Sequence, residues 1–263
     1  MLFYFLFLLL GAAAAVGVTL AAQLSWWWLL PLAIGLAAAI AAAYMLTLLF
    51  VTLFLPRKEG GRHSPTCRFI VVHTVAWVLF FLGYRLDAEG LEKLPTDRTF
   101  LLVGNHRSNL DPMVEMVALR RWKLAFVSKP ENFKIPVAGP FIRSCSYLSI
   151  DRDDPRKAVS TIHRAADYIR EGRCSMGIYP EGTRSRTGEL LPFHHGSFKI
   201  AKLADCSIAV MTVRYGKRHG LRRRVELRVP EVLDVEYVRA NRTNAISDRV
   251  RETIERQLEQ PLD

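Results

Sequence analysis

The stretch Gly104-Asn105-His106-Arg107-Ser108-Asn109-Leu110-Asp111-Pro112 decides the fold that we expect, because it follows the apolar run Thr99–Val103 and precedes a segment with helical spacing. An apolar run that breaks into a polar turn predicts a strand followed by a loop. Pro112 suits the first turn of a helix, where its missing N–H would be unpaired anyway, and Asp111 before it suits the N-cap. The sequence therefore predicts the order strand, loop, helix.

In this order His106 lies in the loop and Asp111 lies at the start of the helix. The carboxylate of Asp111 is then close enough to hold one imidazole nitrogen of His106. A histidine held in this way has a fixed tautomer and a stabilised cation, which suits a general base for an alcohol near neutral pH. A second interpretation stays open, in which Asp111 only caps the helix and His106 is only a polar loop residue.

A second motif, Ile178-Tyr179-Pro180-Glu181-Gly182-Thr183-Arg184-Ser185, follows further along the chain. It is again an apolar, strand-like run that breaks into a turn with proline, glycine and charge. Together the two motifs resemble those of the glycerophospholipid acyltransferase family, whose first motif is Asn-His-(four residues)-Asp and whose third is Phe/Tyr-Pro-Glu-Gly-Thr-Arg. The resemblance covers roughly Gly90 to Tyr215, and two such motifs in the right order are specific.

The resemblance implies an enzyme that moves a fatty acyl group from a thioester to the 2-hydroxyl of 1-acylglycerol 3-phosphate, which forms phosphatidic acid in phospholipid biosynthesis. His106 would be the base and Asp111 would orient it. The acceptor phosphate would be bound by Arg184 and Arg152, with the residues of the second motif around them: Glu181, Gly182 and Thr183. We expect Glu181 to hold the arginines in place and backbone N–H groups around Gly182 to stabilise the oxyanion.

Arg152 belongs to the segment Ser149-Ile150-Asp151-Arg152, which is similar to the second motif of the family. An Asp-Arg pair after a strand is also typical of a solvated turn. The chain departs from the family at its fourth motif, where Cys206–Val213 lacks the two usual prolines. Serine and valine accept extended geometry, so a strand is still expected, and the departure concerns the preference for the acyl chain or acceptor.

The first 55 residues contain no Asp, Glu, Lys or Arg, so the net charge of +11 belongs entirely to the rest of the chain. Leu2–Ala22 and Leu29–Leu55 are each long enough to cross a hydrocarbon core of ~30 Å at ~1.5 Å per residue. They predict a transmembrane helical hairpin whose turn, Gln23–Trp28, carries three tryptophans. The basic residues after it place the body on the cytoplasmic face of the cell membrane: Arg57, Lys58, Arg62 and His63.

A cleaved signal peptide is the other interpretation of Met1–Ala22, but a basic leading segment is missing and a second span follows. A strongly basic body indicates anionic lipids as partners. Nucleic acid is the competing partner for such a charge, although no nucleic-acid motif is found. The four cysteines have no metal-ligand spacing, so we expect neither a metal nor disulfides, and the chemistry needs no cofactor beyond acyl-CoA or acyl-carrier protein as co-substrate.

From Leu86 onward short apolar runs alternate with helical patterns, which predicts an α/β fold with a mixed sheet flanked by helices. The expected strands are Thr99–Val103, Leu124–Val127, Tyr147–Ile150, Ser175–Tyr179, Ile208–Val213 and Val225–Val229. The expected helices are Pro112–Arg121, Pro155–Arg170, His195–Leu203 and Ile246–Leu258. The apolar run Phe69–Tyr84 is either a membrane-embedded or interfacial helix, which we favour, or a buried core helix.

The predicted organisation is therefore residues 1–55 as two transmembrane helices, 56–85 as a basic linker with a membrane-associated or interfacial helix, and 86–263 as the α/β acyltransferase domain. Two rival functions stay open. One is the same chemistry on another acceptor, such as glycerol 3-phosphate or another lysolipid. The other is a non-catalytic membrane scaffold with this fold, although His106 and Asp111 are both intact. Nothing in the sequence chooses between coenzyme A and acyl carrier protein as the acyl carrier.

Overall fold

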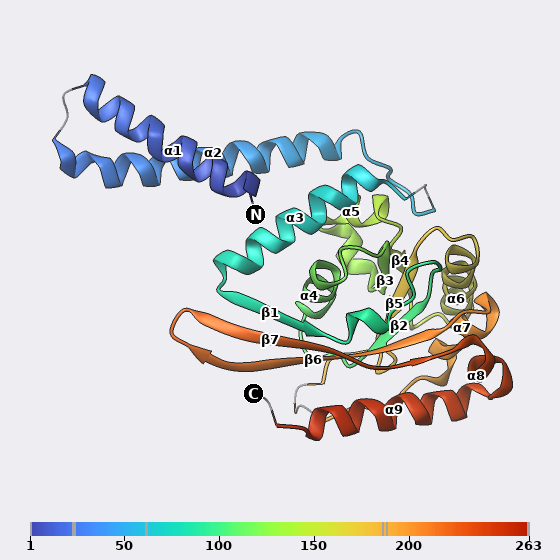
Figure 1. The fold of residues 1–263 in the computed structure, drawn as a ribbon. Helices are drawn as coiled ribbons and strands as arrows, with labels where there is room; N and C mark the ends of the chain where they lie inside the picture. The colour runs from blue at the N-terminus through green and yellow to red at the C-terminus, as the bar shows by residue number, and fades with distance from the viewer. Residues whose placement is uncertain (1, 23–24, 61–62, 186, 188, 262–263) are drawn as a thin grey trace. The chain divides into compact units, whose positions relative to one another are not determined.

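The computed structural model describes the chain except for residues 1, 23–24, 61–62, 186, 188 and 262–263 (Figure 1). The chain forms two compact units, Met1–Leu55 and Pro56–Asp263. Part of the expected tryptophan turn (residues 23–24) and one of the expected flanking cations, Arg62, lie outside the described residues.

The first unit consists of helix α1 (Leu2–Ala21), a short 3₁₀ turn η1 (Trp26–Trp28) and helix α2 (Leu29–Thr52). The two α-helices lie against each other, and a Cβ atom at Gly11 of α1 would be 3.7 Å from Ile40 and 3.8 Å from Leu36 of α2. By length and composition, α2 is the one helix among the described residues that could cross a membrane. The described apolar part of α1, Gly11–Ala21, is shorter.

The second unit is built on a mixed sheet in the order β1-β7-β6-β2-β5-β3-β4. Its strands are β1 (Tyr84–Glu89), β2 (Leu101–Gly104), β3 (Leu124–Ser128), β4 (Leu148–Ser149), β5 (Ser175–Ile178), β6 (Ile208–His219) and β7 (Arg222–Leu233). Strands β6 and β7 pair antiparallel, and all the other pairs are parallel. The predicted α/β fold with a mixed sheet is thus confirmed, with longer β6 and β7 than expected.

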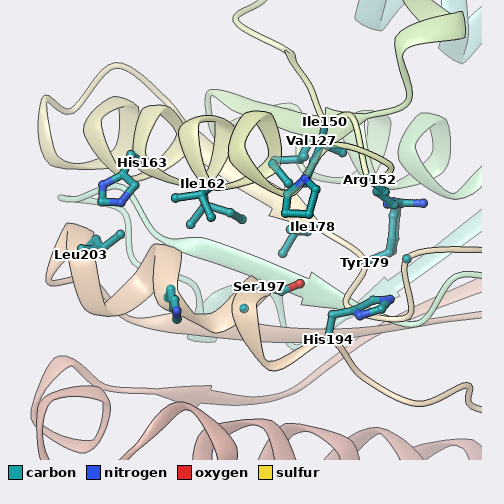
Figure 2. Close-up of a pocket in the computed structure, with 16 residues that line it drawn as sticks. Val127, Ile150, Arg152, Ile162, His163, Ile178, Tyr179, His194, Ser197 and Leu203 are labelled. Atoms are coloured by element: carbon teal, nitrogen blue, oxygen red, sulfur yellow. The ribbon is translucent and has the colours of Figure 1, made fainter.

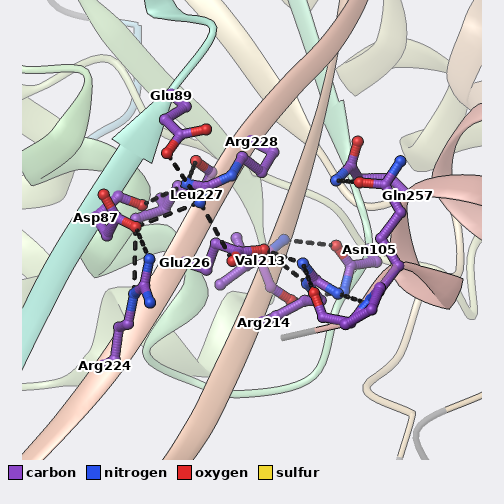
Figure 3. Close-up of polar contacts among 12 residues, drawn as sticks. Asp87, Glu89, Asn105, Val213, Arg214, Arg224, Glu226, Leu227, Arg228 and Gln257 are labelled. Atoms are coloured by element: carbon purple, nitrogen blue, oxygen red, sulfur yellow. Dashed lines mark hydrogen bonds and ion pairs between the residues drawn. The ribbon is translucent and has the colours of Figure 1, made fainter. Parts of the chain in front are cut away.

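Strand β1 was missed although its residues alternate between apolar and charged, because the apolar run Phe69–Tyr84 was assigned to a helix and includes the first residue of the strand. It lies at the edge of the sheet, and charged contacts help to attach it to β7 (Figure 3). Asp87 of β1 accepts hydrogen bonds from Arg224 and from Arg228 of β7, and Arg228 also lies 3.1 Å from Glu89. The expected helix Phe69–Tyr84 also extends too far toward its C-terminus. The helix before β1 ends at Phe81, and Gly83 turns the chain with a φ of +79°.

Seven α-helices are described in the second unit: α3 (Pro65–Phe81), α4 (Asp111–Ala118), α5 (Ala138–Ser144), α6 (Pro155–Arg170), α7 (Lys199–Ala204), α8 (Val235–Ala240) and α9 (Thr243–Glu259). Short 3₁₀ turns lie at Leu91–Lys93 (η2), Pro130–Lys134 (η3) and His195–Phe198 (η4). In Figure 1, α3, α4 and α5 lie on one side of the sheet and α9 lies on the other. The expected helix His195–Leu203 is thus η4 followed by α7.

The core lies around the central strands β2, β3 and β5, in which almost every residue is buried. Their runs are continuously apolar, as is typical of parallel strands that are covered on both faces. Gly177 of β5 lies opposite Phe126 of β3, and a Cβ atom there would be 2.4 Å from the phenyl ring. The ring therefore occupies the space that a larger residue at position 177 would need.

Helix α3 packs on the second unit with one face and exposes the other. Buried Arg68 donates hydrogen bonds to the backbone carbonyls of Leu124, at 2.8 Å, and of Trp122. These carbonyls satisfy a cation that would otherwise be costly to bury. The opposite face of α3 carries exposed Phe69 and Phe80. The helix is therefore not a fully buried core helix, and its membrane-embedded or interfacial position stays a prediction.

Candidate active site

The two sequence motifs meet because they follow neighbouring parallel strands. Strands β2 and β5 pair in parallel, with Val103 opposite Ile178, so the loops at their carboxyl ends leave the sheet at the same edge. The backbone N–H of Ser185 donates a hydrogen bond of 2.9 Å to the carbonyl of His106. This bond joins the second motif to the first.

His106 and Asp111 form the dyad that the sequence predicts. The distance between Nδ1 of His106 and Oδ2 of Asp111 is 2.9 Å. The same oxygen accepts hydrogen bonds from the backbone N–H groups of Arg107, at 2.7 Å, and Ser108, at 2.8 Å, while the hydroxyl of Tyr215 donates to Oδ1 at 2.7 Å. Because Nδ1 is engaged, Nε2 is the imidazole nitrogen left for chemistry.

The expectation that Asp111 caps helix α4 is wrong. Leu110 occupies the N-cap position, and Asp111 is the first residue of the helix, followed by Pro112 in the first turn as expected. The carboxylate of Asp111 turns back toward the loop amides instead of forward into the helix. Its side chain is completely buried, whereas that of His106 is 18% exposed. The fixed carboxylate thus holds an imidazole that remains reachable.

Tyr179 contacts the imidazole of His106, and Glu115 contacts Tyr179 in turn. The sequence analysis assigned a role to neither residue. The ring of Tyr179 stacks on that of His106, with centroids 4.2 Å apart and planes within 8°. The Tyr179 hydroxyl donates a hydrogen bond of 2.9 Å to Oε2 of Glu115. Burial raises the pKa of Glu115 well above its usual range, and the charge of nearby Asp111 raises it further. The sequence contained a signal for Glu115, because a residue four positions after Asp111 lies on the same face of the helix.

Asn105 fixes the loop to strand β6. Its buried side chain donates to the carbonyl of Val213 at 3.1 Å and accepts from the N–H of Val213 at 2.9 Å (Figure 3). The amide thus continues the pairing of β2 with β6 beyond the last strand residue, Gly104. Tyr215 lies two residues further along β6 and is thereby brought to Asp111. Tyr215 was missed because its contact depends on the order of the strands.

Glu181 has a different position from the one expected. Its Oε1 accepts a hydrogen bond of 2.7 Å from the N–H of His106, and its Oε2 accepts one of 3.0 Å from the N–H of Leu191. In the described part of the chain, no contact links it to Arg152 or Arg184. It is buried, and this burial raises its pKa. Glu181 therefore holds the loop of His106 in place and does not position the arginines.

Gly182 lies where the second motif touches other parts of the site. Its φ is +73°, and a Cβ atom there would be 2.9 Å from the ring of His194 and 3.8 Å from Cζ of Arg152. Only glycine suits this conformation and this spacing. We expected backbone N–H groups around Gly182 to stabilise an oxyanion. The N–H of Gly182 itself instead donates to the carbonyl of Tyr179 at 3.1 Å and is not available for that role.

A cavity of about 400 Å³ lies between helix α6 and the η4–α7 segment (Figure 2). Neither His106 nor Asp111 is among the residues that line it. Its walls are mostly apolar: Val127, Ile150, Val159, Ile162, Ile178 and Leu203. Arg152, Gly182 and His194 line it at one end, together with Tyr179, which stacks on His106. His163 and Leu203 lie at the other end in Figure 2. The cavity thus has mostly apolar walls, and Tyr179 at its polar end is the residue that separates it from the imidazole of His106.

The structure brings most of the expected site residues together. His106, Asp111 and Glu181 are linked by hydrogen bonds, and Arg152 and Gly182 lie at the polar end of the cavity. Thr183 and Arg184 lie on the same loop and are exposed. His194 contacts this loop as well: its N–H donates a hydrogen bond of 2.8 Å to the carbonyl of Pro180.

The fold and the site define an α/β protein with a histidine that remains reachable, held by a buried aspartate, and with an apolar cavity behind Tyr179. The family model described as "Acyltransferase" matches residues 85–215, about half of the chain. The chain belongs to this acyltransferase family.

Its relatives include several named 1-acyl-sn-glycerol-3-phosphate acyltransferases. The chloroplastic protein LPAT1 from Arabidopsis thaliana is 30% identical over 67% of this chain and 49% of its own length. The protein from Borreliella burgdorferi is 27% identical, over 67% of this chain and 74% of its own. The alpha form from Bos taurus is 24% identical, over 80% and 74%. The chain spans about half the length of the plant chloroplast relatives that it matches.

A crystal structure with the same fold is that of the 1-acyl-sn-glycerophosphate acyltransferase PlsC from Thermotoga maritima. The match covers 84% of this chain and 90% of that protein, with a TM-score of 0.63 and 22% sequence identity. The likeness extends across the sheet and its helices and confirms the fold.

We predict that the wild type loses stability relative to Glu115→Gln as the pH rises above about 4.5. Burial holds the pKa of Glu115 above the ordinary 4.5, so the folded protein retains a proton that the unfolded chain releases. Stability that depends on this proton is full below about pH 4.5 and falls as the pH rises toward the native pKa. Glutamine does not titrate and still accepts from Tyr179.

Thermal unfolding of the wild type and of Glu115→Gln at pH 4 and pH 7 tests this. The exposed carboxylate of Glu92, changed to glutamine, controls for the loss of one surface charge. Equal pH dependence of the wild type and Glu115→Gln would contradict the assignment of a retained proton to Glu115.

Proposed function

We propose that this protein transfers a fatty acyl group from an acyl thioester to the 2-hydroxyl of 1-acylglycerol 3-phosphate and so forms phosphatidic acid. The observation that carries this proposal is the His106–Asp111 dyad, with Nδ1 held at 2.9 Å. Tyr179, whose ring stacks on that of His106, also lines a cavity with mostly apolar walls. The names of the relatives support the same reaction.

In the proposed reaction, Nε2 of His106 takes the proton of the acceptor hydroxyl while the oxygen attacks the thioester carbonyl carbon. Asp111 stabilises the imidazolium that forms. The tetrahedral intermediate then collapses, the C–S bond breaks, and the thiolate leaves with the proton from His106. The products are an ester and a free thiol. The thioester supplies the activation, so the reaction as written needs neither a metal nor a redox cofactor.

The cavity offers a place for the two chemically different ends of a lipid. Its apolar walls suit a fatty acyl chain, and its polar end carries the guanidinium of Arg152 beside Gly182. We propose that Arg152 and Arg184 bind the acceptor phosphate, with Thr183 in the same loop. A planar guanidinium can make paired, charge-assisted bonds to phosphate. The acyl carrier is either coenzyme A or acyl carrier protein.

We propose further that α1 and α2 cross the cell membrane as a hairpin and that the second unit lies on its cytoplasmic face. Two features support this. The segment up to Leu55 contains no charged side chain, and basic residues such as Arg57 and Lys58 follow it directly. The length and composition of α2 suit a membrane span.

We predict that His106→Ala and Asp111→Asn each lower kcat by about 10²- to 10⁴-fold, as expected for the loss of a positioned base. Asparagine at 111 keeps one oxygen for the amides of Arg107 and Ser108 and an NH₂ group that can donate to Tyr215. It removes the charge that stabilises the imidazolium.

The measurement is acyl transfer from a radiolabelled thioester, together with thermal unfolding of each variant. An unchanged melting temperature for Asp111→Asn separates the loss of chemistry from the loss of structure. Wild-type turnover by Asp111→Asn would overturn the role of the dyad.

We predict that Arg184→Lys raises KM for the acceptor about ten- to a hundredfold, because one charge-assisted bond is worth ~1.5–3 kcal/mol and lysine lacks the planar fork. Arg152→Lys should act in the same direction and less strongly. The matched control is Arg121→Lys, an exposed arginine just before β3, at the opposite edge of the sheet. A rise in KM for the acyl donor instead would assign these arginines to the carrier's phosphates.

We predict that a cysteine introduced in the turn 23–28 is labelled by an impermeant reagent from outside intact cells. A cysteine at Glu59, after the second span, should be protected until the cells are opened, because the positive-inside rule places this basic segment in the cytoplasm. Labelling of the Glu59 position in intact cells would contradict this topology.

A further inference from the structure

The antiparallel pair β6–β7 ends in a strongly basic turn. Residues 217–222 of this turn are all exposed, and they include Lys217, Arg218 and Arg222. Leu221 lies among them with 83% of its surface exposed. Figure 1 shows the turn at the far end of the hairpin, where it projects away from α8 and the start of α9.

The basic side chains of the turn are not neutralised by the protein. Within the described residues, no ion pair or hydrogen bond is found for the side chains of Lys217, Arg218 and Arg222. The arginines that follow in β7 are engaged: Arg223 donates to the carbonyl of Gly216, and Arg224 pairs with Asp87. The turn therefore carries a local positive charge that a partner can meet.

The turn is attached to the exposed apolar end of helix α3. The N–H of Arg223 donates a hydrogen bond of 2.8 Å to the carbonyl of Gly83, and a Cβ atom at Gly83 would overlap the carbonyl of Leu221. Directly before Gly83, Phe80, Phe81 and Leu82 are each about half exposed. Figure 1 shows the end of α3 and the turn at the same end of this unit. Together, these neighbours form what we call the tip surface: Phe80, Phe81, Leu82, Lys217, Arg218, Leu221 and Arg222.

We propose that the tip surface docks into the headgroup layer of an anionic lipid bilayer, as a membrane contact made by the α/β unit itself. Exposed aromatic and aliphatic side chains next to unpaired cations are the combination that binds the interface of an anionic membrane. An acidic soluble protein could meet the cations, but it would not account for Phe80, Phe81, Leu82 and Leu221 on the same surface. An anionic membrane accounts for both the cations and the apolar side chains of the tip surface.

Docking at this surface affects the candidate active site directly. Lys217 lies two residues after Tyr215, whose hydroxyl binds Asp111. The docked tip surface therefore brings the dyad close to the layer in which a lipid acceptor lies. This consequence rests on the proposed function, whereas the docking itself does not.

The experiment uses the full chain carrying a nitroxide on Leu221→Cys, reconstituted into vesicles of phosphatidylcholine with phosphatidylglycerol or of phosphatidylcholine alone. The four native cysteines are buried, so the introduced thiol is the reactive one. A second label on Phe81→Cys covers the case in which the turn variant misfolds. The control label, on Asn244→Cys, takes an exposed position in the first turn of α9. Figure 1 shows the start of α9, next to α8, at the opposite end of this unit from the β6–β7 turn.

In anionic vesicles we expect the labels at 221 and 81 to be accessible to oxygen and shielded from a water-soluble nickel complex, while the label at 244 stays accessible to nickel. High salt should reverse the shielding. Each cation near an anionic surface contributes about a fivefold factor, so the triple change Lys217→Gln, Arg218→Gln, Arg222→Gln should weaken docking on the order of a hundredfold.

Equal nickel accessibility at 221, 81 and 244 in anionic vesicles would overturn the proposal. So would immobilisation of the tip labels by an acidic protein, with purified acyl carrier protein as the probe, without any shielding by lipid. Because the readout does not involve turnover, a docked but inactive protein would contradict the proposed function and leave this inference intact.

Discussion

The structure of the site depends on one buried carboxylate, that of Asp111. It accepts hydrogen bonds from the imidazole of His106, from the amides of Arg107 and Ser108, and from the hydroxyl of Tyr215. A carboxylate without partners is very costly to bury, and these donors together offset that cost. The requirement links the loop after β2, the start of α4 and strand β6. The geometry of the imidazole is therefore a consequence of how the charge is satisfied.

The parallel centre of the sheet brings the other parts of the site to this carboxylate. Strand β2 lies between β5 and β6, so its loop is flanked by the second motif on one side and by Tyr215 on the other. Asn105 joins the loop to β6, and Glu181 accepts the N–H of His106 from the opposite side. The loop is therefore held from both neighbours. This arrangement keeps a short, polar segment rigid without burying its reactive nitrogen.

A second carboxyl group, that of Glu115, is buried near Asp111 and has different partners. Glu115 is buried one helical turn after Asp111, and its raised pKa favours the neutral acid. Asp111, in contrast, accepts hydrogen bonds from several donors. Two ionised carboxylates so close in a low-dielectric interior would repel each other, and the neutral form of one removes that conflict. Tyr179 connects this acid to the imidazole by a hydrogen bond at one end and a stacked ring at the other.

The sequence by itself determined the features that depend on neighbours along the chain. The strand, loop and helix around His106 follow from an apolar run, a polar turn and Pro112. The dyad follows because the four residues between His106 and Asp111 suffice to close it. The family and the mixed α/β fold were readable for the same reason, since motifs and periodicity are local properties. What Glu181 binds, which tyrosine reaches Asp111 and which face of α3 is covered were decided only by the tertiary structure. Each depends on which strands lie side by side, and contacts between segments far apart in the chain leave no local pattern in the sequence.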